Sequence, residues 1–600
     1  MSAAEHDPNL LALFDRMARS RGDNPFLWRK SDGAYRPWSW QRTAREARLL
    51  ARALRARGLA PGDRVLLVSE NRPEWLIADL AVMAAGGITV PAYTTNTARE
   101  HAYLLAHSGA TVAVVAGDRL ATPLLPALAD APAVRLLVSI DPLTGAGALT
   151  VPQLSWREAL ALGEQQPDLA PEPASALGRH DTACFIYTSG TGGLPKGVML
   201  SHGNILANVS GAHAALALLG LDEHEVFLSF LPLSHAYEHT AGQFLPIAVG
   251  AQIYYSDGIE ALSSNLLEAR PTVMGCVPRL YEVMRQRILH AVARQRGLKP
   301  KLFARTIELG IKRYEQPHAL TLPERLLDRL LDRLVREQAR ARFGGRIKAL
   351  VSGGAPLNVE VGMFFTALGL PVFQGYGQTE CSPVVSVNTP RRVKLHSVGP
   401  PMPGIEVRIA ADGEILVRGE SVMQGYWRDP EATAETLKDG WLHTGDIGLL
   451  DEDGFLQITD RKKDIIVNSG GDNLAPQRVE GILLLQHEIG QAIVYGDRRP
   501  HLVALIVPDA EFAKSYARKH GCRSDLAALV EHKGFQVTMN EAVRRANASL
   551  SPLERVRHFR VVAEPFSIEN GLMTPTMKLK RQVIYRTHHK LFEELYESRH

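Results

Sequence analysis

Short apolar runs alternate with stretches of helical period along the first part of the chain. Three of these runs are RVLLVSE (64–70), TVAVVAG (111–117) and VRLLVSI (134–140). This alternation is typical of βαβ units, which build mostly parallel, doubly wound sheets. A polar, proline-bearing stretch (163–180) indicates a surface connection, and a second series of apolar runs begins at Ala183. The sequence therefore predicts an α/β fold with doubly wound sheets.

The length of the chain predicts more than one domain, because 600 residues exceed what a single hydrophobic core accommodates. From 397 to 460, short alternating runs are separated by Asp-Gly and Pro-Gly turns, which is typical of a small β-rich subdomain. The polar, glycine-bearing segment that follows Asp460 marks a boundary. We therefore expect a large N-terminal domain over 1–460 and a small C-terminal α/β domain over 461–600.

The charge of the chain is unevenly distributed. The formal net charge is only +4, too small for a chain of this length to indicate a nucleic-acid partner. The segment 285–348, however, holds seventeen Lys or Arg against six Asp or Glu, a local charge of +11 that leaves −7 elsewhere. Within it, leucines recur at four-residue steps among Arg325, Arg329, Arg333 and Arg336, the pattern of an amphipathic helix. We expect either a helical insertion with a solvated basic face or a face held against anionic lipid headgroups.

Cysteines and apolar runs exclude several classes of protein. The four cysteines are isolated and lack ligand spacing, which argues against a disulfide framework or structural zinc and favours a reducing compartment. The N-terminus lacks the features of a secretory signal, and the longest apolar stretch (75–93) is broken by Asp79 and two glycines, so no membrane span is expected. We therefore expect a cytoplasmic protein, peripheral on the inner face of the membrane if the basic insertion binds lipid.

One loop carries the strongest functional signal. After the strand-like run CFIY, the segment 188–197 combines three hydroxyl side chains, four glycines and a lysine. Such a loop exposes backbone N–H groups and hydroxyls to a polyphosphate, and Lys196 adds positive charge. A P-loop would need glycine at Pro195 and a hydroxyl residue at Gly197, so that pattern does not fit. We expect a nucleotide phosphate to bind at these residues of the loop: Thr188, Ser189, Gly190, Thr191, Gly192, Gly193 and Lys196.

Seven motifs occur in an order that resembles the adenylate-forming acyl-CoA synthetases. The first is the loop YTSGTGGLPKGV, which departs from the family pattern only at Gly192, where a second threonine is usual. The others are FLPLSHAYEH (230–239), SGGAPL (352–357), QGYGQTE (374–380), HTGD (443–446), DRKKD (460–464) and TPTMKLKR (574–581). The resemblance covers nearly the whole chain, and TPTMKLKR together with the basic insertion looks like the long-chain fatty acid–CoA ligase branch. It implies that the small C-terminal domain moves as a lid.

The resemblance implies a reaction in two steps. A fatty acid carboxylate attacks the α-phosphate of ATP, with Mg²⁺ as cofactor, to give acyl-adenylate and pyrophosphate; coenzyme A then gives a thioester and AMP. By resemblance, Lys578, Glu380 and Thr191 are catalytic, and Glu380 and Thr191 hold the metal. Three alternatives stay open: a medium-chain or aryl acid–CoA ligase, adenylate transfer to a carrier-protein thiol, and a non-catalytic nucleotide-binding protein that docks on membranes. A homodimer also stays open.

The same resemblance assigns the nucleotide and acyl sites. The residues expected around the adenosine and α-phosphate are Gly354, Ala355, Pro356, Gln374, Gly375, Tyr376, Gly377, Thr379, Asp446 and Arg461. Tyr376 would stack on adenine, whereas Asp446 and Arg461 would bind the ribose hydroxyls. Lys463 is the expected hinge of the lid, and the residues expected along the acyl or CoA channel are His235, Tyr237, Gly470 and Gly471. Taken singly, each of these residues also fits an ordinary core or surface position.

Overall fold

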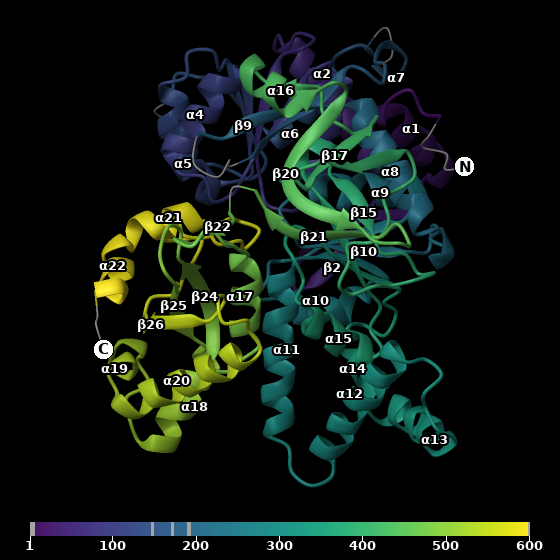
Figure 1. Cartoon of the computed structure of the whole chain (residues 1–600). Coiled ribbons are helices and arrows are strands. Elements are labelled where there is room, and N and C mark those ends of the chain that lie inside the picture. The colour runs from purple at the N-terminus through teal and green to yellow at the C-terminus, as the bar shows by residue number, and fades with distance from the viewer. Residues whose placement is uncertain (1–5, 146–148, 170–172, 189–193, 463, 598–600) are drawn as a thin grey trace.

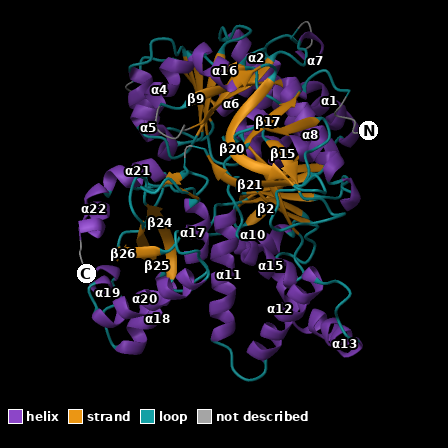
Figure 2. Cartoon of the chain, in the orientation of Figure 1, coloured by secondary structure: helices purple, strands orange, loops and turns teal. Residues whose placement is uncertain are grey.

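The structure is a computed structural model that describes residues 6–145, 149–169, 173–188, 194–462 and 464–597. Figure 1 shows a large body that contains most of the chain and a smaller unit, coloured yellow-green at the lower left, that contains its C-terminal part. Helices cover sheets in both parts (Figure 2).

The first sheet of the body has eight strands in the order β18-β9-β8-β4-β3-β5-β6-β7. Its pairs are parallel except for β8 with β9 and β9 with β18, which are antiparallel. The strands are β3 (Arg64–Val68), β4 (Ile88–Ala92), β5 (Ala110–Val115), β6 (Leu136–Ser139), β7 (Gln153–Ser155), β8 (Thr182–Thr188), β9 (Lys196–Ser201) and β18 (Gly425–Tyr426).

The second sheet also has eight strands, in the order β15-β14-β13-β12-β10-β11-β1-β2. Only the two edge strands, β2 and β15, pair antiparallel. The strands are β1 (Pro25–Ser31), β2 (Ala34–Ser39), β10 (Val226–Ser229), β11 (Gln252–Tyr255), β12 (Val273–Cys276), β13 (Ala349–Ser352), β14 (Val372–Gly377) and β15 (Val384–Val387). The prediction of an α/β fold with doubly wound sheets is confirmed.

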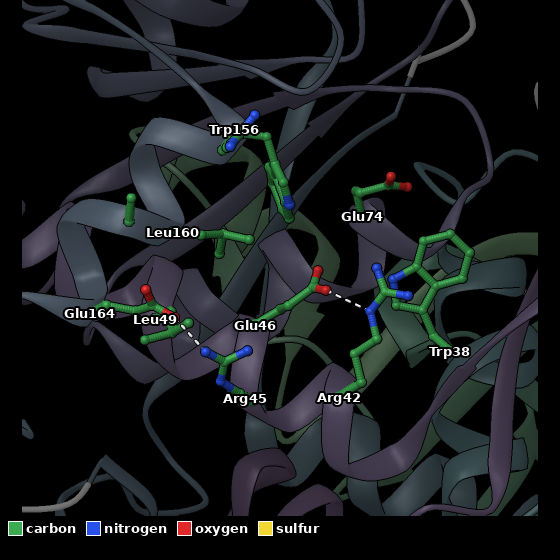
Figure 3. Close-up of a pocket in the computed structure, with 11 residues that line it drawn as sticks. Trp38, Arg42, Arg45, Glu46, Leu49, Glu74, Trp156, Leu160 and Glu164 are labelled. Atoms are coloured by element: carbon green, nitrogen blue, oxygen red, sulfur yellow. Dashed lines mark hydrogen bonds and ion pairs between the residues drawn. The ribbon is translucent and has the colours of Figure 1, made fainter.

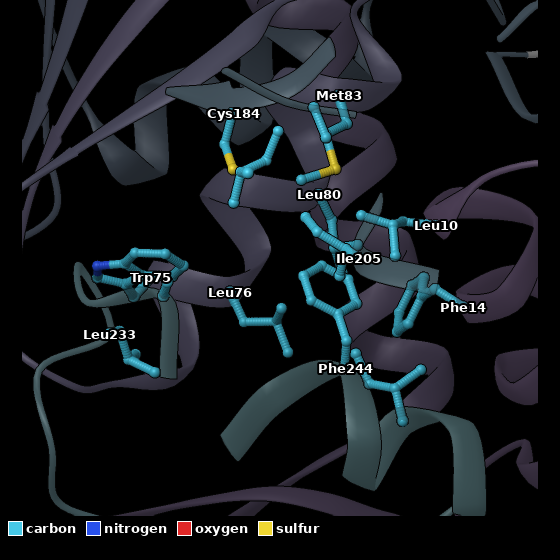
Figure 4. Packing of buried hydrophobic residues seen from close by; sticks show 14 of the residues in the cluster. Leu10, Phe14, Trp75, Leu76, Leu80, Met83, Cys184, Ile205, Leu233 and Phe244 are labelled. Atoms are coloured by element: carbon cyan, nitrogen blue, oxygen red, sulfur yellow. The ribbon is translucent and has the colours of Figure 1, made fainter. Parts of the chain in front are cut away.

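Helix α3 (Pro73–Ala84) lies at the centre of the body. Its side chains are buried almost all round, which is the mark of a core helix. Figure 4 shows Leu76 and Leu80 of this helix beside Ile205 and Phe244, within one apolar cluster. Helix α3 takes up the first part of the long apolar stretch seen in the sequence.

The other helices of the body outside the insertion are α1 (Leu10–Arg21), α2 (Trp40–Ala56), α4 (Ala98–Ser108), α5 (Asp118–Ala129), α6 (Trp156–Glu164), α7 (Pro173–Ala176), α8 (His202–Ala215), the 3₁₀ turn η3 (Ala217–Leu219), the π-turn η4 (Glu238–Phe244), α9 (Leu245–Val249), α10 (Leu262–Ala269), α15 (Val359–Ala367), the 3₁₀ turn η6 (Thr379–Cys381) and α16 (Pro430–Thr436).

A smaller antiparallel sheet and the C-terminal unit complete the chain. The sheet contains β16 (Ile405–Ile409), β17 (Glu414–Gly419), β19 (Leu437–Lys438), β20 (Trp441–Leu450) and β21 (Leu456–Arg461). The C-terminal unit has its own apolar clusters. Its elements are β22 (Ile466–Val467), β23 (Asn473–Leu474), α17 (Pro476–Leu483), β24 (Ile489–Tyr495), β25 (Leu502–Pro508), α18 (Ala510–His520), α19 (Leu526–Val530), α20 (Lys533–Ala548), β26 (Val556–Val561), α21 (Arg581–Thr587) and α22 (His589–Glu597).

Polar contacts tie the C-terminal unit to the body. Gln286 Nε2 donates to the Ile489 carbonyl at 3.2 Å, and Asn358 Nδ2 donates to the Gly481 carbonyl at 3.2 Å. Met577 of the C-terminal unit packs against an apolar cluster of the body. The two parts are therefore in direct contact.

The basic segment forms helices that project at the bottom of Figure 1. They are α11 (Pro278–Ala293), α12 (Lys299–Glu315), α13 (Leu322–Leu331), the π-turn η5 (Asp332–Arg336) and α14 (Glu337–Arg342). Arg336 does not lie on the solvated face that its spacing suggests: it is fully buried. Its guanidinium donates to the Asp328 carboxylate and to the Ala367 carbonyl, each at 2.7 Å. The helical pattern is right, but its polar face is not uniformly basic.

All four cysteines are free thiols. Among the described residues, no helix combines the length and the apolar character that a membrane crossing requires.

Candidate active site

The predicted phosphate loop joins two neighbouring strands at the edge of the first sheet. Thr188 ends β8 and pairs with Lys196, which begins β9. Pro195 is held by its carbonyl, which accepts a hydrogen bond from the Tyr103 hydroxyl at 2.8 Å. The centre of the loop lies outside the described residues, and with it the predicted ligands Ser189, Gly190, Thr191, Gly192 and Gly193.

Lys196 and Glu380 are linked through a tyrosine. Lys196 Nζ lies 4.8 Å from the centre of the Tyr426 ring and 3.7 Å from Asp429 Oδ2. The Tyr426 hydroxyl donates to Glu380 Oε1 at 2.8 Å. Glu380 belongs to the turn η6, directly beyond Gly377 at the end of β14. The structure thus brings the predicted metal carboxylate to the end of the predicted phosphate loop.

Sequence reasoning missed Tyr426 and Asp429. Tyr426 reaches the site because β18 adds to the edge of β9, where Tyr426 pairs with Val198. The two residues are far apart in the sequence, and a two-residue strand has no periodicity. Only the glycine before Tyr426 hints at a special backbone position, since Gly425 has φ +140°.

The residue chemistry at Glu380 fits a magnesium ion. Mg²⁺ usually keeps several waters and binds one or two carboxylates together with substrate phosphates. Glu380 offers one carboxylate, oriented by Tyr426. No group of three or more His, Cys, Asp or Glu that could hold a metal is found in the described part of the chain.

Tyr376, Asp446 and Arg461 form one cluster. The Tyr376 hydroxyl donates to Asp446 Oδ2 at 2.6 Å, and Arg461 Nε donates to Asp446 Oδ1 at 2.9 Å. Asp446 and Arg461 face each other on the paired strands β20 and β21. Burial, and next the charge of Asp446, raise the pKa of the Tyr376 phenol well above its usual value. The two residues predicted for the ribose are therefore brought together with the residue predicted for adenine.

Two polar atoms at the carboxyl ends of neighbouring strands lack partners. Ser352 ends β13 and pairs with Gln374 of β14. Ser352 Oγ and Gln374 Oε1 are buried without a hydrogen-bond partner among the described residues. Ligands of open α/β sheets bind at the carboxyl ends of strands. These two atoms, beside the predicted segments Gly354 to Pro356 and Gly375 to Gly377, mark a place where a ligand would complete the hydrogen bonding.

Lys578 of the C-terminal unit reaches the body at Gly354. Lys578 Cε lies 3.9 Å from the position that a Cβ at Gly354 would take, and Gly354 has φ +85°. The turn that holds Lys578 is closed by Thr574, whose hydroxyl accepts from the Lys578 N–H at 3.0 Å. The side chain still reaches solvent. The protein around it desolvates the ammonium, and this effect, followed by the charge of Arg461, lowers the pKa of Lys578 to about 8.

His235 and Tyr237 lie near the turn that Lys578 reaches. Burial, and next the positive charge of Lys578, lower the pKa of His235 to about 3, so the imidazole is neutral. The Tyr237 hydroxyl donates to the Val351 carbonyl at 2.9 Å. A Cβ at Gly353 would lie 3.2 Å from the Tyr237 ring, so the ring lies close against this turn.

Behind Tyr237 lies an apolar cavity of about 50 Å³. Apolar side chains from β10, η4, β12 and β15 line it, together with the carboxyl group of Glu238. Burial raises the pKa of Glu238 to about 8, which keeps this carboxyl protonated at neutral pH. A cavity of this character and place is suited to part of an apolar chain.

The hinge and glycine predictions have different outcomes. Lys463 lies outside the described residues. Its neighbour Lys462 binds Asp412 at 2.7 Å and Glu414 at 3.3 Å. Gly470 and Gly471 lie in the hairpin between β22 and β23, where a Cβ at Gly471 would meet nothing within 4 Å. Both glycines are exposed, and a Cβ at Gly470 would meet only Asn468 and Asp472 of the same hairpin, so the tip of the hairpin faces solvent in this arrangement.

A larger hollow of about 470 Å³ lies between α2 and α6, and Figure 3 shows side chains that line it. Three arginines and three glutamates line it, and two of the arginines pair with its own glutamates: Arg42 with Glu46 at 2.8 Å, and Arg45 with Glu164. None of the residues predicted for catalysis lines it. Because its charges neutralise one another, this hollow does not compete with the cluster around Lys578.

Comparison with known proteins identifies the family of the chain. The family model described as "AMP-binding enzyme" matches residues 14–427, and "AMP-binding enzyme C-terminal domain" matches 463–600. The long-chain-fatty-acid–CoA ligase FadD15 of Mycobacterium bovis is 35% identical over 100% of this chain and 98% of its own length. Long chain acyl-CoA synthetase 6, peroxisomal, of Arabidopsis thaliana is 34% identical over 92% of this chain and 80% of its own.

Solved structures agree on the fold. The A domain of a carboxylic acid reductase from Segniliparus rugosus, in complex with AMP and a co-purified carboxylic acid, has a TM-score of 0.77 at 21% identity and covers 99% of this chain and 94% of its own. A benzoate CoA ligase from Burkholderia xenovorans has a TM-score of 0.71 at 22% identity, covering 96% and 99%. The predicted relationship is confirmed: the chain belongs to the AMP-binding enzyme family, in the branch of the long-chain-fatty-acid–CoA ligases.

Proposed function

We propose that this chain is a long-chain-fatty-acid–CoA ligase. It activates a fatty acid with ATP to acyl-adenylate and pyrophosphate, then transfers the acyl group to the thiol of coenzyme A and releases AMP. Relatives with ligase names over their full length support the reaction, and ATP and CoA are its co-substrates. The observation that carries the proposal is the approach of Lys578 to Gly354, which places one cation from the C-terminal unit at the carboxyl ends of the body's strands.

Lys578 serves the first step. As the fatty acid carboxylate attacks the α-phosphate, negative charge crowds at the two reacting groups, and a fixed ammonium beside them stabilises the transition state. With a pKa of about 8, Lys578 is mostly charged at neutral pH. Neutral His235 adds no charge of its own, so the charges that act on Lys578 are those of Arg461, which repels it, and of Asp446 and Asp464, which attract it.

Glu380 and Lys196 act on the phosphates. Glu380, held by Tyr426, would bind a Mg²⁺ that accompanies ATP, with Thr191 as the second predicted ligand. When bound, the ion neutralises phosphate charge. Lys196, at the end of the loop, would contribute a second positive charge to the phosphates.

Asp446 would accept hydrogen bonds from the ribose hydroxyls. Its carboxylate accepts from Tyr376 and from Arg461, one bond on each oxygen. An ionised carboxylate has about four lone-pair positions, so the two ribose hydroxyls can still donate to it. Arg461 fixes its orientation, and the Tyr376 ring lies next to it for contact with adenine.

The second step requires the C-terminal unit to move. Lys578 would leave the turn at Gly354, and the hairpin of Gly470 and Gly471, which faces open space here, would take its place beside the CoA thiol. Lys463 is the proposed hinge. The neighbouring pairs of Lys462 with Asp412 and Glu414 anchor the start of that movement to the antiparallel sheet.

The test is an assay with ATP, magnesium and fatty acids of graded chain length. Pyrophosphate release that depends on a long-chain acid, followed by CoA thioester formation, is the expected result. Preference for a medium-chain or aryl acid would correct the substrate, and transfer to a carrier-protein thiol in place of CoA would correct the acceptor. Absence of acid-dependent pyrophosphate release across all acids would mean a nucleotide-binding protein without catalysis. This assay tests neither the homodimer nor the association with an anionic membrane surface, both of which the sequence leaves open.

A further inference from the structure

The outer side of the basic insertion carries a row of solvent-exposed leucines. Leu322, Leu326, Leu330 and Leu334 are 76%, 67%, 51% and 45% exposed. Their four-residue spacing places them along one side of α13 and η5. Single apolar side chains are normal on a surface, whereas a continuous row along one helix indicates a contact that covers it.

Three arginines share this side of the helix. Arg325, Arg329 and Arg333 are exposed and alternate with the leucines. Two further arginines of the insertion, Arg336 and Arg340, are bound to aspartates at 2.7 and 2.9 Å. In the described part of the chain, no carboxylate lies within ion-pair distance of the three outer arginines. Arg325 Nε donates to the Leu320 carbonyl at 3.0 Å, which is a neutral partner, so no described residue neutralises any of the three charges.

The opposite side of the helix fixes this orientation. Leu331 is fully buried and packs with Leu309 of α12. A capping box holds the start of α13, because the Thr321 hydroxyl accepts from the Glu324 N–H and the Glu324 carboxylate accepts from the Thr321 N–H. Lys312 also binds Glu324, at 2.8 Å. A helix anchored at its start and along its inner side presents the leucines permanently.

We propose that this side of the helix, the α13 face, docks the enzyme on the surface of an anionic lipid bilayer. The α13 face consists of Leu322, Arg325, Leu326, Arg329, Leu330, Arg333 and Leu334. Leucines beside arginines on one face are the pattern of a helix that lies in the membrane interface, its apolar side chains at the boundary of the acyl chains and its cations at the headgroups.

The distribution of charge supports a lipid surface as the partner. The segment 285–348 carries +11 and the remainder of the chain −7. A negatively charged bilayer therefore attracts the insertion and repels the rest of the molecule, so that the α13 face turns toward the membrane. This inference goes beyond the proposed reaction and does not depend on it.

The test measures partition of the full-length protein onto vesicles in the absence of ATP and CoA. Wild type should float with phosphatidylcholine vesicles that contain phosphatidylglycerol, not with pure phosphatidylcholine, and binding should weaken as salt rises. Arg325→Gln/Arg329→Gln/Arg333→Gln should lower the partition coefficient about a hundredfold, since each arginine contributes roughly fivefold. Leu326→Ser/Leu330→Ser should lower it about tenfold or more per leucine.

The matched control is Leu218→Ser/Leu553→Ser, which removes two leucines that are 70% and 51% exposed elsewhere on the surface. It should bind vesicles as wild type does. All the substituted side chains are exposed, so thermal unfolding should stay at the wild-type temperature, and the arginine and leucine variants test the face independently.

Four results would overturn the proposal. Wild type that binds neither kind of vesicle has no such face. Equal binding by wild type and both variants places the contact elsewhere, and equal binding to neutral vesicles removes the role of the arginines. A lipid-free dimer in sedimentation velocity that becomes monomeric on Leu326→Ser/Leu330→Ser shows that a second copy of the chain covers the leucines. Because none of these measurements uses the reaction, they leave the proposed catalysis untouched.

Discussion

Replacing Lys578 by methionine should separate the two half-reactions. The side chain keeps most of its length but loses its charge at Gly354. An ammonium about 4 Å from a phosphate charge contributes about 4 kcal/mol at an effective dielectric constant of about 20, which is roughly a thousandfold in rate. Solvent reaches Lys578 and screens part of this energy. The expected loss in adenylation is therefore about a hundredfold to a thousandfold.

The assay measures each half-reaction separately. Acid-dependent exchange of labelled pyrophosphate into ATP reports adenylation, and thioester formation from supplied acyl-adenylate reports the second step. Lys578→Met should reduce only the first. Lys580→Met is the matched control, because Lys580 lies two residues away in the same turn region and its backbone, not its side chain, holds Leu572. Equal loss of both half-reactions in Lys578→Met would refute the assignment.

The pH dependence of adenylation tests the role of Lys578 in a second way. Lys578 must be charged to act, so kcat/KM for adenylation should be level below its pKa and fall as pH rises through about 8. The phosphates of bound ATP favour the charged ammonium, so the fall in kcat should come at higher pH. Lys578→Met should lack this alkaline limb. A wild-type profile without it, or a variant that keeps it, contradicts the reasoning.

Three further substitutions test other contacts. Tyr426→Phe removes the hydrogen bond to Glu380, worth about 1.5 to 3 kcal/mol for a charged acceptor, and should raise the magnesium concentration needed for half-maximal adenylation about tenfold or more; an unchanged requirement would separate Glu380 from the metal. Lys463→Pro should slow thioester formation from supplied acyl-adenylate more than adenylation, and equal effects would remove the hinge role. Arg336→Leu leaves a buried aspartate without its main partner and should lower the free energy of unfolding by about 3 kcal/mol in urea titration, whereas the half-exposed Arg340→Leu should cost less than about 1 kcal/mol; equal losses would contradict the burial argument.

The sequence predicted those parts of the candidate site that depend on a single short segment. The strand at 182–188 and the lysine at 196 follow from an apolar run and a glycine-rich loop, and the structure places them on paired strands. The position of Tyr426 in the site could not be predicted from the sequence, because it depends on a two-residue strand that pairs with β9 from more than two hundred residues away. Contacts of that range depend on how the sheets pack, which no local period encodes.

The insertion shows a different limit. Four-residue spacing predicted an amphipathic helix, and α13 is one, but the pattern does not say which side meets the body. The π-turn over Asp332–Arg336 shifts the helical phase at the end of the run. Arg336 consequently turns inward to Asp328, while Leu334 remains outside. A wide turn of this kind leaves no mark in the composition of the segment, so the exposure of the leucines required the structure.

The charges where the body meets the C-terminal unit explain why the lid movement would follow the first step of the proposed reaction. Lys578 and Arg461 repel each other, which helps to lower the pKa of Lys578 when no phosphate is bound. ATP together with a carboxylate brings negative charge between them and thus favours the arrangement in which Lys578 lies at Gly354. Departure of pyrophosphate removes most of that charge, while the acyl-adenylate keeps only one phosphate. Lys578 is then left with the desolvation of its ammonium and the repulsion of Arg461, opposed only by Asp446 and Asp464. The loss of phosphate charge therefore weakens the hold on Lys578 at Gly354 and prepares the movement that the second step needs.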